Sequence, residues 1–301
     1  MRRLIPPLVA LLLIAAACAP PRTGALGPAP AVPSATAVPS ATTAAPTGAP
    51  APGPPATRDP GPPAGPGTPT LRVSGGPDGT LDVQLWFVRA GRLAPTRHAL
   101  PATVATSRLA LAELAAGPSP AERVDGLTTL VPAGAEVTRI AGGVATLVPP
   151  PGFDAGGAVV VRMRRAQVVW TLTQFPTVRR VAFAPAGAAT GRDDYADLLS
   201  PIVVTAPVTG DRVASPVTVT GTADVFEATV SARVLDAAGR EVGTGFTTAS
   251  CGSGCRGAYR MAVRYRRAAA GAGVVEVFQV SARDGSRVDV VRVPVTLTST
   301  G

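Results

Sequence analysis

The three cysteines of this 301-residue chain have positions that suggest chemistry, and the first of them is Cys18. It follows the apolar residues 8–17, which end in Ala15-Ala16-Ala17. Small residues before a cysteine, after such an apolar run, resemble the bacterial lipobox, where a thiol is diacylated and the chain is cut before it. Cys18 is therefore predicted to be lipidated. Because Ala15 stands where leucine is usual, ordinary signal cleavage at the Ala-x-Ala run remains the alternative.

The other two cysteines, Cys251 and Cys255, lie in the glycine-rich segment Cys251-Gly252-Ser253-Gly254-Cys255. With Cys18 acylated, they are the two thiols left in an oxidising compartment, so a disulfide is predicted. The alternative is a metal site, which needs more ligands than two cysteines supply. The single histidine, His98, lies in another part of the chain. The sequence therefore predicts no metal and no cofactor.

No combination of side chains predicts catalysis. His98 has no recognisable nucleophile or orienting acid in the sequence and is expected to be a half-exposed turn residue. Ser253 lacks the strand–turn–helix setting of a nucleophile elbow. Asp193, Asp194 and Asp197 are interpreted as a solvated hinge between domains, with a weak calcium site as the alternative. The chain contains no lysine, which excludes a phosphate-binding P-loop and Schiff-base chemistry.

The densest basic segment contains Arg162, Arg164 and Arg165, and the whole chain has a formal charge of +9. If these residues lie on a helix, they could form a patch for anionic lipid, wall polymer or an acidic partner. The alternative is a solvated helix face without a ligand. Nucleic acid is not an expected partner, because the N-terminus directs the chain out of the cytoplasm.

The N-terminal residues predict the compartment. Arg2 and Arg3 precede the apolar residues 8–17, a run too short for a bilayer that needs about 20 residues. Residues 1–18 are therefore predicted to be a lipoprotein signal peptide, and the protein to be held by its lipid at the outer face of the cell membrane. Residues 19–70 are rich in Pro, Ala and Thr and predict a disordered linker, because so little apolar area can be buried.

Residues 71–187 predict a first folded domain that mixes strands and helices. A strand is expected over 81–88, followed by a turn at Ala90-Gly91, and a helix over 101–116 that stops at Gly117-Pro118. Ser119-Pro120-Ala121-Glu122 predicts a capping box that begins a short helix. A hairpin is expected around Gly142-Gly143, with strands at 136–140 and 144–148.

Several segments of this domain are similar to the GerMN family of sporulation and spore germination. The resemblance is carried, in order, by Leu85-Trp86-Phe87-Val88, Ala110-Leu111-Ala112-Glu113-Leu114, Gly126-Leu127-Thr128-Thr129 and Gln167-Val168-Val169-Trp170-Thr171-Leu172-Thr173-Gln174-Phe175-Pro176. It covers nearly all of residues 71–187 and implies a compact α+β fold like the ring-building modules of sporulation complexes. It also implies a helix from Val159 to Phe175, although Val159-Val160-Val161 alone favours a strand.

Residues 201–298 predict a second domain that follows an interdomain linker at 188–200. Short alternating strands with turn signals and no helix-length segment indicate an all-β immunoglobulin-like sandwich. Ser215-Pro216-Val217, Val225-Phe226-Glu227-Ala228 and Val277-Phe278-Gln279-Val280-Ser281 resemble the Gmad2 domain, a usual companion of GerMN. The two resemblances support each other.

Together these features predict a non-enzymatic, lipid-anchored envelope protein whose two domains bind an envelope protein or a cell-wall polymer. The resemblance implies envelope assembly of the sporulation and germination type. One alternative is a regulatory lipoprotein partner of a membrane sensor or transport system. A second alternative is an enzyme acting on peptidoglycan or polysaccharide through a pair of carboxylates that the sequence does not reveal.

Overall fold

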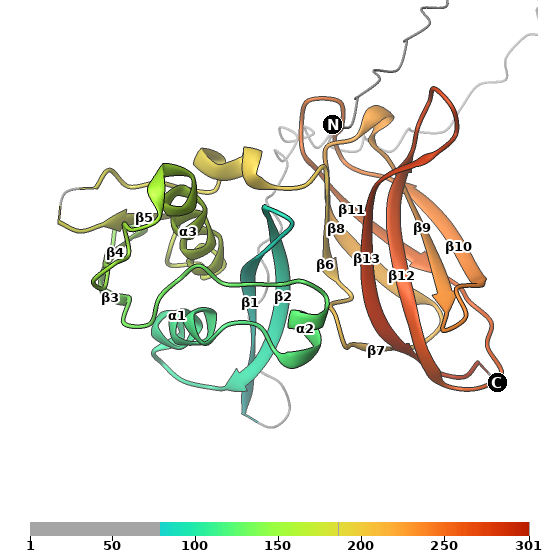
Figure 1. Cartoon of the computed structure of the whole chain (residues 1–301), viewed down its shortest axis with the longest axis horizontal. Coiled ribbons are helices and arrows are strands. Elements are labelled where there is room, and N and C mark those ends of the chain that lie inside the picture. The colour runs from blue at the N-terminus through green and yellow to red at the C-terminus, as the bar shows by residue number, and fades with distance from the viewer. Residues whose placement is uncertain (1–78, 186, 301) are drawn as a thin grey trace, which may run out of the picture. The chain divides into compact units, whose positions relative to one another are not determined.

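The computed structural model describes residues 79–185 and 187–300. The predicted signal peptide with Cys18 and the predicted linker at 19–70 lie outside these residues. Within the described part of the chain, no helix combines the length and the apolar character that crossing a membrane requires. Two domains follow each other here, an α+β domain and an all-β domain, as the sequence predicts (Figure 1).

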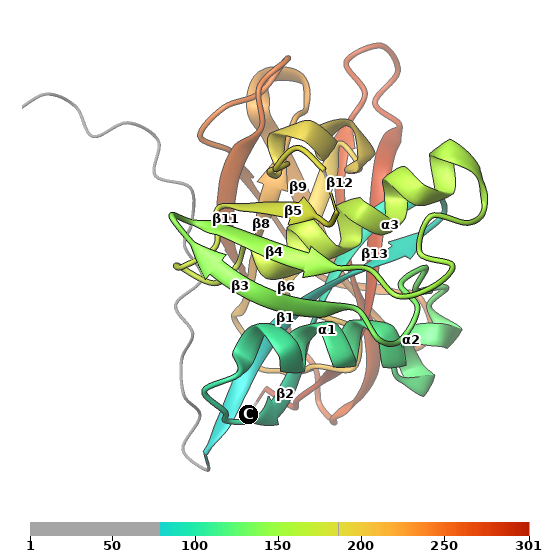
Figure 2. The same cartoon turned by 90° about the vertical axis from the view of Figure 1, so that its left-hand side faces the viewer.

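The first domain has two sheets and two main helices. In chain order its elements are β1 (Thr80–Arg89), β2 (Arg92–Pro101), α1 (Thr106–Ala116), α2 (Pro120–Val124), β3 (Glu136–Ala141), β4 (Val144–Val148), α3 (Gly157–Leu172) and β5 (Arg180–Phe183). β1 and β2 form an antiparallel hairpin, and β4 lies between β3 and β5. The helices α1 and α3 pack against each other beside the sheet of β3, β4 and β5 (Figure 2).

The start of the first helix differs from the sequence prediction. The β1–β2 hairpin turns at Ala90 and Gly91, both with positive φ, and its register continues until Thr80 pairs with Pro101. Pro101 therefore ends a strand, and α1 begins at Thr106 instead of at residue 101. The prediction was wrong here because the hairpin pairing that continues to Thr80 and Pro101 overrides the local helical signal.

Other local signals gave the right elements. Ser119 and Glu122 form the predicted capping box, with Ser119 accepting from the Glu122 amide and Glu122 accepting from the Ser119 amide. The Gly142-Gly143 turn joins β3 to β4 as expected. Residues 159–163 are helical, as the family resemblance implies, although α3 ends at Leu172, three residues before Phe175.

β1 has only β2 as a strand neighbour. Side chains of α3 and of the turn after it hydrogen-bond to the backbone N–H and C=O groups along the other edge of β1. The Gln84 amide donates to Oε1 of Gln174 at 2.8 Å, and Nε2 of Gln174 returns a bond to the Gln84 carbonyl at 2.7 Å. Further along, the backbone amide of Trp86 donates to Oγ1 of Thr171 at 3.1 Å. Nε2 of Gln167 donates to the Trp86 carbonyl at 2.9 Å. Since these groups are buried, the polar side chains replace a missing third strand.

The second domain is a sandwich of two antiparallel sheets with one short parallel pair. Its elements are β6 (Ile202–Ala206), β7 (Arg212–Val213), β8 (Val217–Ala223), η2 (Phe226–Ala228), β9 (Thr229–Asp236), β10 (Glu241–Thr248), β11 (Gly257–Val263), β12 (Gly271–Val280) and β13 (Arg287–Leu297). One sheet has the order β10-β9-β12-β13-β7 and the other β11-β8-β6. Valines alternate into the space between the sheets, among them Val219, Val230 and Val275, all fully buried.

Asp193, Asp194 and Asp197 are exposed to solvent as the sequence suggested, but the segment between the domains that contains them is packed against the first domain and is not a hinge. It contains η1 (Asp193–Leu198), and Tyr195 and Leu199 are buried in the core of the first domain. Arg192 lies over the Trp170 ring, 4.7 Å from its centroid. Asp197 accepts a bond from Arg162, which lowers the pKa of its carboxyl. The linker is therefore bound to the first domain by aromatic and ionic contacts that are distant in sequence.

The edge of β1 yields a stability prediction. Gln174→Leu is expected to lower the free energy of unfolding by about 2–4 kcal/mol, because the Gln84 amide and carbonyl lose their partner while staying buried. Gln279→Leu, at a half-buried position in the sandwich, is the matched control and should cost less. Urea unfolding of both variants measures the difference. Equal losses would show that the edge of β1 does not need Gln174.

Candidate functional site: the junction between the domains

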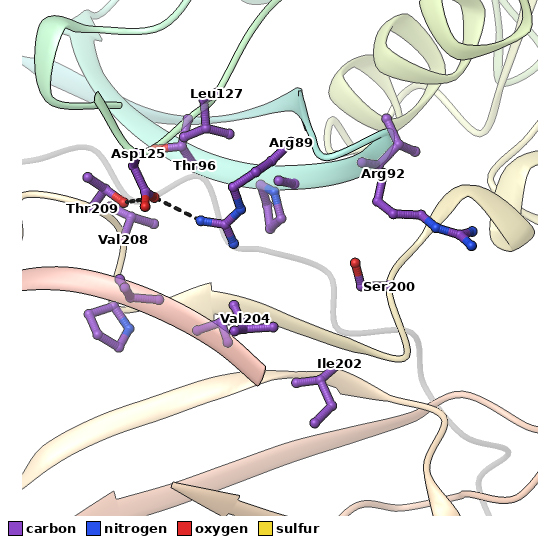
Figure 3. A pocket seen from close by; sticks show the side chains of 16 residues that line it. Arg89, Arg92, Thr96, Asp125, Leu127, Ser200, Ile202, Val204, Val208 and Thr209 are labelled. Atoms are coloured by element: carbon purple, nitrogen blue, oxygen red, sulfur yellow. Dashed lines mark hydrogen bonds and ion pairs between the residues drawn. The ribbon is translucent and has the colours of Figure 1, made fainter. Parts of the chain in front are cut away.

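The two domains lie in one compact unit and contact each other through Asp125, which follows α2. One carboxylate oxygen of Asp125, Oδ2, accepts from Nη1 of Arg89 at 2.8 Å and from Oγ1 of Thr209 at 2.9 Å. Arg89 ends β1 in the first domain, whereas Thr209 belongs to the second. Figure 3 shows the two donors approaching Asp125 from opposite sides. The Asp125 carboxylate therefore binds a residue of each domain.

Further contacts extend this junction along β2. Arg97 pairs with Asp211 of the second domain at 3.2 Å. Arg92 donates to the Asp197 carbonyl of the linker at 2.6 Å. Leu93 forms an isolated parallel bridge with Leu199, next to the start of β6. Arginines of the β1–β2 hairpin thus reach the linker and the second domain, so the hairpin is the surface on which the sandwich rests.

The crevice at this junction is small. Its lining includes Arg89, Arg92, Leu127, Val204, Val208 and Ser200, and it encloses about 40 Å³ (Figure 3). That volume holds a few water molecules and no larger ligand. The junction can therefore fix the orientation of the domains, whereas a small-molecule substrate would not fit.

His98 lies in a cluster of charged side chains and is not the half-exposed turn residue that the sequence suggested. It is inside β2, and its side chain is 14% exposed. Nδ1 of His98 lies 2.8 Å from a Glu113 oxygen, and Nε2 lies 2.9 Å from Oε2 of Glu122. Thr96 also donates to Glu122. The cluster therefore joins β2 to α1 and α2.

The two central groups of this cluster shift each other's proton affinity. The hydrogen bond to Glu122 raises the pKa of His98 above its usual value, although burial opposes the change. Burial acts to raise the pKa of Glu122, but the bonds from His98, Thr96 and the Ser119 amide outweigh it and lower the pKa to about 2. The contacts of His98 with two carboxylates are structural, since neither His98 nor Glu122 lines the junction crevice.

The predicted basic patch does not form as the sequence suggested. Arg164 points inward, is 8% exposed, and donates to the carbonyls of Leu130, Phe153 and Ala155. Arg162 binds both carboxylate oxygens of Asp197, and Arg165 pairs with Asp154 at 2.9 Å. Because one guanidinium is buried and the other two are paired, these residues do not present a common cationic surface.

The remaining sequence candidates lie at one end of the sandwich. Cys251 and Cys255 are joined in a disulfide, with their Cα atoms 5.7 Å apart. Ser253 of the same loop has a positive φ, and its Oγ accepts from the Glu227 amide at 3.2 Å. This contact ties the loop to η2. The part of the chain that the structure describes contains no group of three or more His, Cys, Asp or Glu side chains that could hold a metal ion.

An open apolar groove lies on the first domain, away from the junction. Its lining includes the three prolines at 149–151 together with Val148, Phe153 and Pro185, and it encloses about 560 Å³. Val148 is 44% exposed there. No sequence pattern indicates this groove, because the loop after β4 meets the residues after β5 only in the folded chain.

The architecture is an α+β domain followed by an immunoglobulin-like sandwich. Residues 76–189 match the family Germane, described as "Sporulation and spore germination". Residues 201–286 match Gmad2, the "Immunoglobulin-like domain of bacterial spore germination". The chain therefore carries a GerMN domain followed by a Gmad2 domain, as the sequence predicted.

Solved structures with similarity to the chain include two of the sporulation protein GerM from Bacillus subtilis. Its first GerMN domain is 23% identical with a TM-score of 0.31, and the match covers 36% of this chain and 85% of that one. Its tandem GerMN domains are 17% identical with a TM-score of 0.34, covering 62% of this chain and 61% of that one. CopC from Methylosinus trichosporium OB3b is 23% identical with a TM-score of 0.23, and the match covers 33% of this chain and 96% of that one. No curated protein matches the chain.

The junction yields a prediction about domain coupling. Asp125→Ala is expected to cost about 1–3 kcal/mol, because Arg89 and Thr209 lose their shared acceptor. Calorimetry should then resolve separate unfolding transitions for the two domains, and proteases should cut more readily within residues 188–200. Asp82→Ala, which removes an exposed carboxylate of β1, is the control. A variant that unfolds like the control would rule out Asp125 as the link.

The His98 cluster yields a pH prediction. Since the folded-state pKa of His98 is raised, its stabilising contribution is complete below the unfolded value of about 6.5 and is lost as pH rises through the folded value. The free energy of unfolding should therefore fall as pH increases above about 6.5. His98→Gln should flatten this dependence and cost about 1–3 kcal/mol at lower pH. Denaturant titrations across pH measure both effects. Because the chain has one histidine, parallel profiles for the two proteins would contradict the assignment.

Proposed function

We propose that this protein is a non-enzymatic, lipid-anchored envelope protein whose GerMN and Gmad2 domains bind a protein or wall partner as one unit. The observation that carries the proposal is the direct junction at Asp125 between two domains of sporulation and germination families. A fixed junction keeps the surfaces of both domains in a constant relation, which suits a partner that touches both.

The contacts of His98 and Glu122, two titratable groups with shifted pKa values, favour binding over catalysis. A general base needs access to its substrate and a pKa suited to accepting a proton. Both ring nitrogens of His98 contact carboxylates, and Glu122 is 3% exposed and holds its capping contacts. Neither residue lines the junction crevice or the proline groove. These groups connect β2 with α1 and α2, and we assign them no catalytic role.

The proline groove supports a protein partner for the GerMN domain. Its lining is mainly apolar, and it lies open at the surface near Phe153, which is itself buried. Apolar side chains at an accessible groove gain free energy when a partner covers them. The Gmad2 domain would meet the same partner or the wall through its own exposed sheet faces.

The proposed lipid anchor is tested with Cys18→Ser. In cells fed an alkyne fatty acid, the natural chain should be labelled and remain with membranes, because the acylated thiol provides the anchor. The variant should lose the label and leave the membrane fraction. A serine substitution elsewhere in the same exported chain, Cys255→Ser, should keep both the label and the membrane association. Labelling of Cys18→Ser, or an unlabelled natural chain, would contradict lipidation at Cys18.

The binding role is tested separately by crosslinking in intact envelopes. The natural chain should yield the same envelope partner from crosslinkers placed on either domain, whereas Asp125→Ala should reduce the yield because the two surfaces are no longer fixed. Recovery of cytoplasmic or nucleic-acid partners would overturn the proposal.

A further inference from the structure

The arginines on the two outer faces of the Gmad2 sandwich differ in whether they have acidic partners. On the face of the five-stranded sheet, Glu276 of β12 is 2% exposed and receives bonds from both neighbouring strands, from Arg233 of β9 and from Arg292 of β13. Arg240, in the turn after β9, pairs with Asp236 at 2.8 Å. Each of these three arginines has an acidic partner, so the charge of these side chains is compensated on this face.

The three-stranded sheet contains no acidic residue. The sequences of β6, β8 and β11 have no Asp or Glu, yet Arg260 lies in β11 and Arg264 directly follows it. Both arginines are exposed, and among the described residues no carboxylate forms an ion pair with either. A salt bridge contributes little at an exposed site, so stability does not require a partner here. The charge of these two side chains is available to a ligand.

The strand geometry places the two guanidinium groups in a line. Residues of β11 alternate between buried and exposed, so Arg260, Ala262 and Arg264 point away from the sandwich core. Four residues of extended chain separate the two arginines by roughly 13 Å. Arg256, four residues earlier, is not part of this line, because it is half-buried and donates to the Ser200 carbonyl at 2.8 Å.

Threonine hydroxyls lie beside this line on the neighbouring strand. In the register of β11 with β8, Arg260 pairs with Thr220 and Ala262 pairs with Thr218. Thr220 in turn contacts Oγ1 of Thr205 on β6 at 3.2 Å. The face therefore combines guanidinium forks with hydroxyl donors, and the residue between the arginines is a small alanine that leaves the surface flat.

We propose that the outer face of β8 and β11 binds a linear polymer of repeating phosphate groups, with Arg260 and Arg264 contacting successive parts of one chain. A guanidinium donates two parallel bonds to the oxygens of a phosphate, and a neighbouring threonine can donate a third. A line of charges suits an extended polymer. A membrane surface fits less well, because the residues beside the arginines are alanine and threonine and offer no large apolar side chain for insertion.

This inference rests on the proposed role as a binding protein of the envelope and names one partner for its second domain. The test uses the full chain with Cys18→Ser, so that no acyl group is attached, and fluorescent long-chain polyphosphate as the probe. We expect polyphosphate to bind at an ionic strength of about 0.15 M and the affinity to fall as salt is added. Orthophosphate should bind far more weakly, since one phosphate cannot reach both arginines.

Two matched double variants give the decisive comparison. Arg260→Gln with Arg264→Gln should raise the Kd for polyphosphate about tenfold or more. Arg139→Gln with Arg283→Gln removes the same charge from exposed positions on β3 and in the β12–β13 loop, and should change the Kd by about twofold at most. All four side chains are exposed, so both variants should unfold like the parent protein.

Three results would overturn the inference. Equal weakening by the two double variants would mean that binding follows net charge and not this face. Equal affinity for orthophosphate and polyphosphate would exclude a contact with an extended chain. If Arg260 and Arg264 instead promoted binding to anionic vesicles over zwitterionic ones, without an effect on polyphosphate, the face would be a membrane contact. Fatty-acid labelling and envelope crosslinking test the proposed function independently of these outcomes.

Discussion

The edge of β1 is the constraint on which the first domain depends. A hairpin of two strands leaves one row of backbone groups without a strand partner, and here that row is buried. Gln167, Thr171 and Gln174 satisfy it from α3 and the turn that follows. The helix is thereby fixed against the strand in position and in register. The hydrophobic core that α1, α3 and β1 share is built around this arrangement.

The position of β1 determines where the second domain rests. Arg89 is the last residue of β1, and its guanidinium meets the same Asp125 oxygen that accepts from Thr209. The capping box that begins α2 holds the segment before Asp125, and Glu122 of that box also binds His98 of β2. Caps, ion pairs and the junction therefore belong to one connected set of polar contacts. Through Glu122, His98 therefore contacts the helix whose C-cap is Asp125.

The arginines of this chain include some that are buried or paired within the fold and others that are exposed and could bind a ligand. Arg164 is buried against backbone carbonyls, and Arg162 and Arg165 pair with aspartates. Arg233 and Arg292 are held by Glu276 on one face of the sandwich. Arg260 and Arg264 are exposed on the other face, in a sheet without carboxylates. The net charge of +9 is therefore uninformative about partners until each guanidinium is placed.

The sequence by itself determined the features that depend on neighbours in the chain. The capping box at Ser119, the Gly142-Gly143 hairpin and the order of the two domains were all predicted from local patterns or from family motifs. The tertiary structure decided the rest. It ended β2 at Pro101, turned Arg164 inward, and bound the linker through Tyr195. It also placed His98 between two glutamates and Gln174 against β1. Each of these outcomes depends on a partner that is distant in the chain, whose position is set only when the core packs.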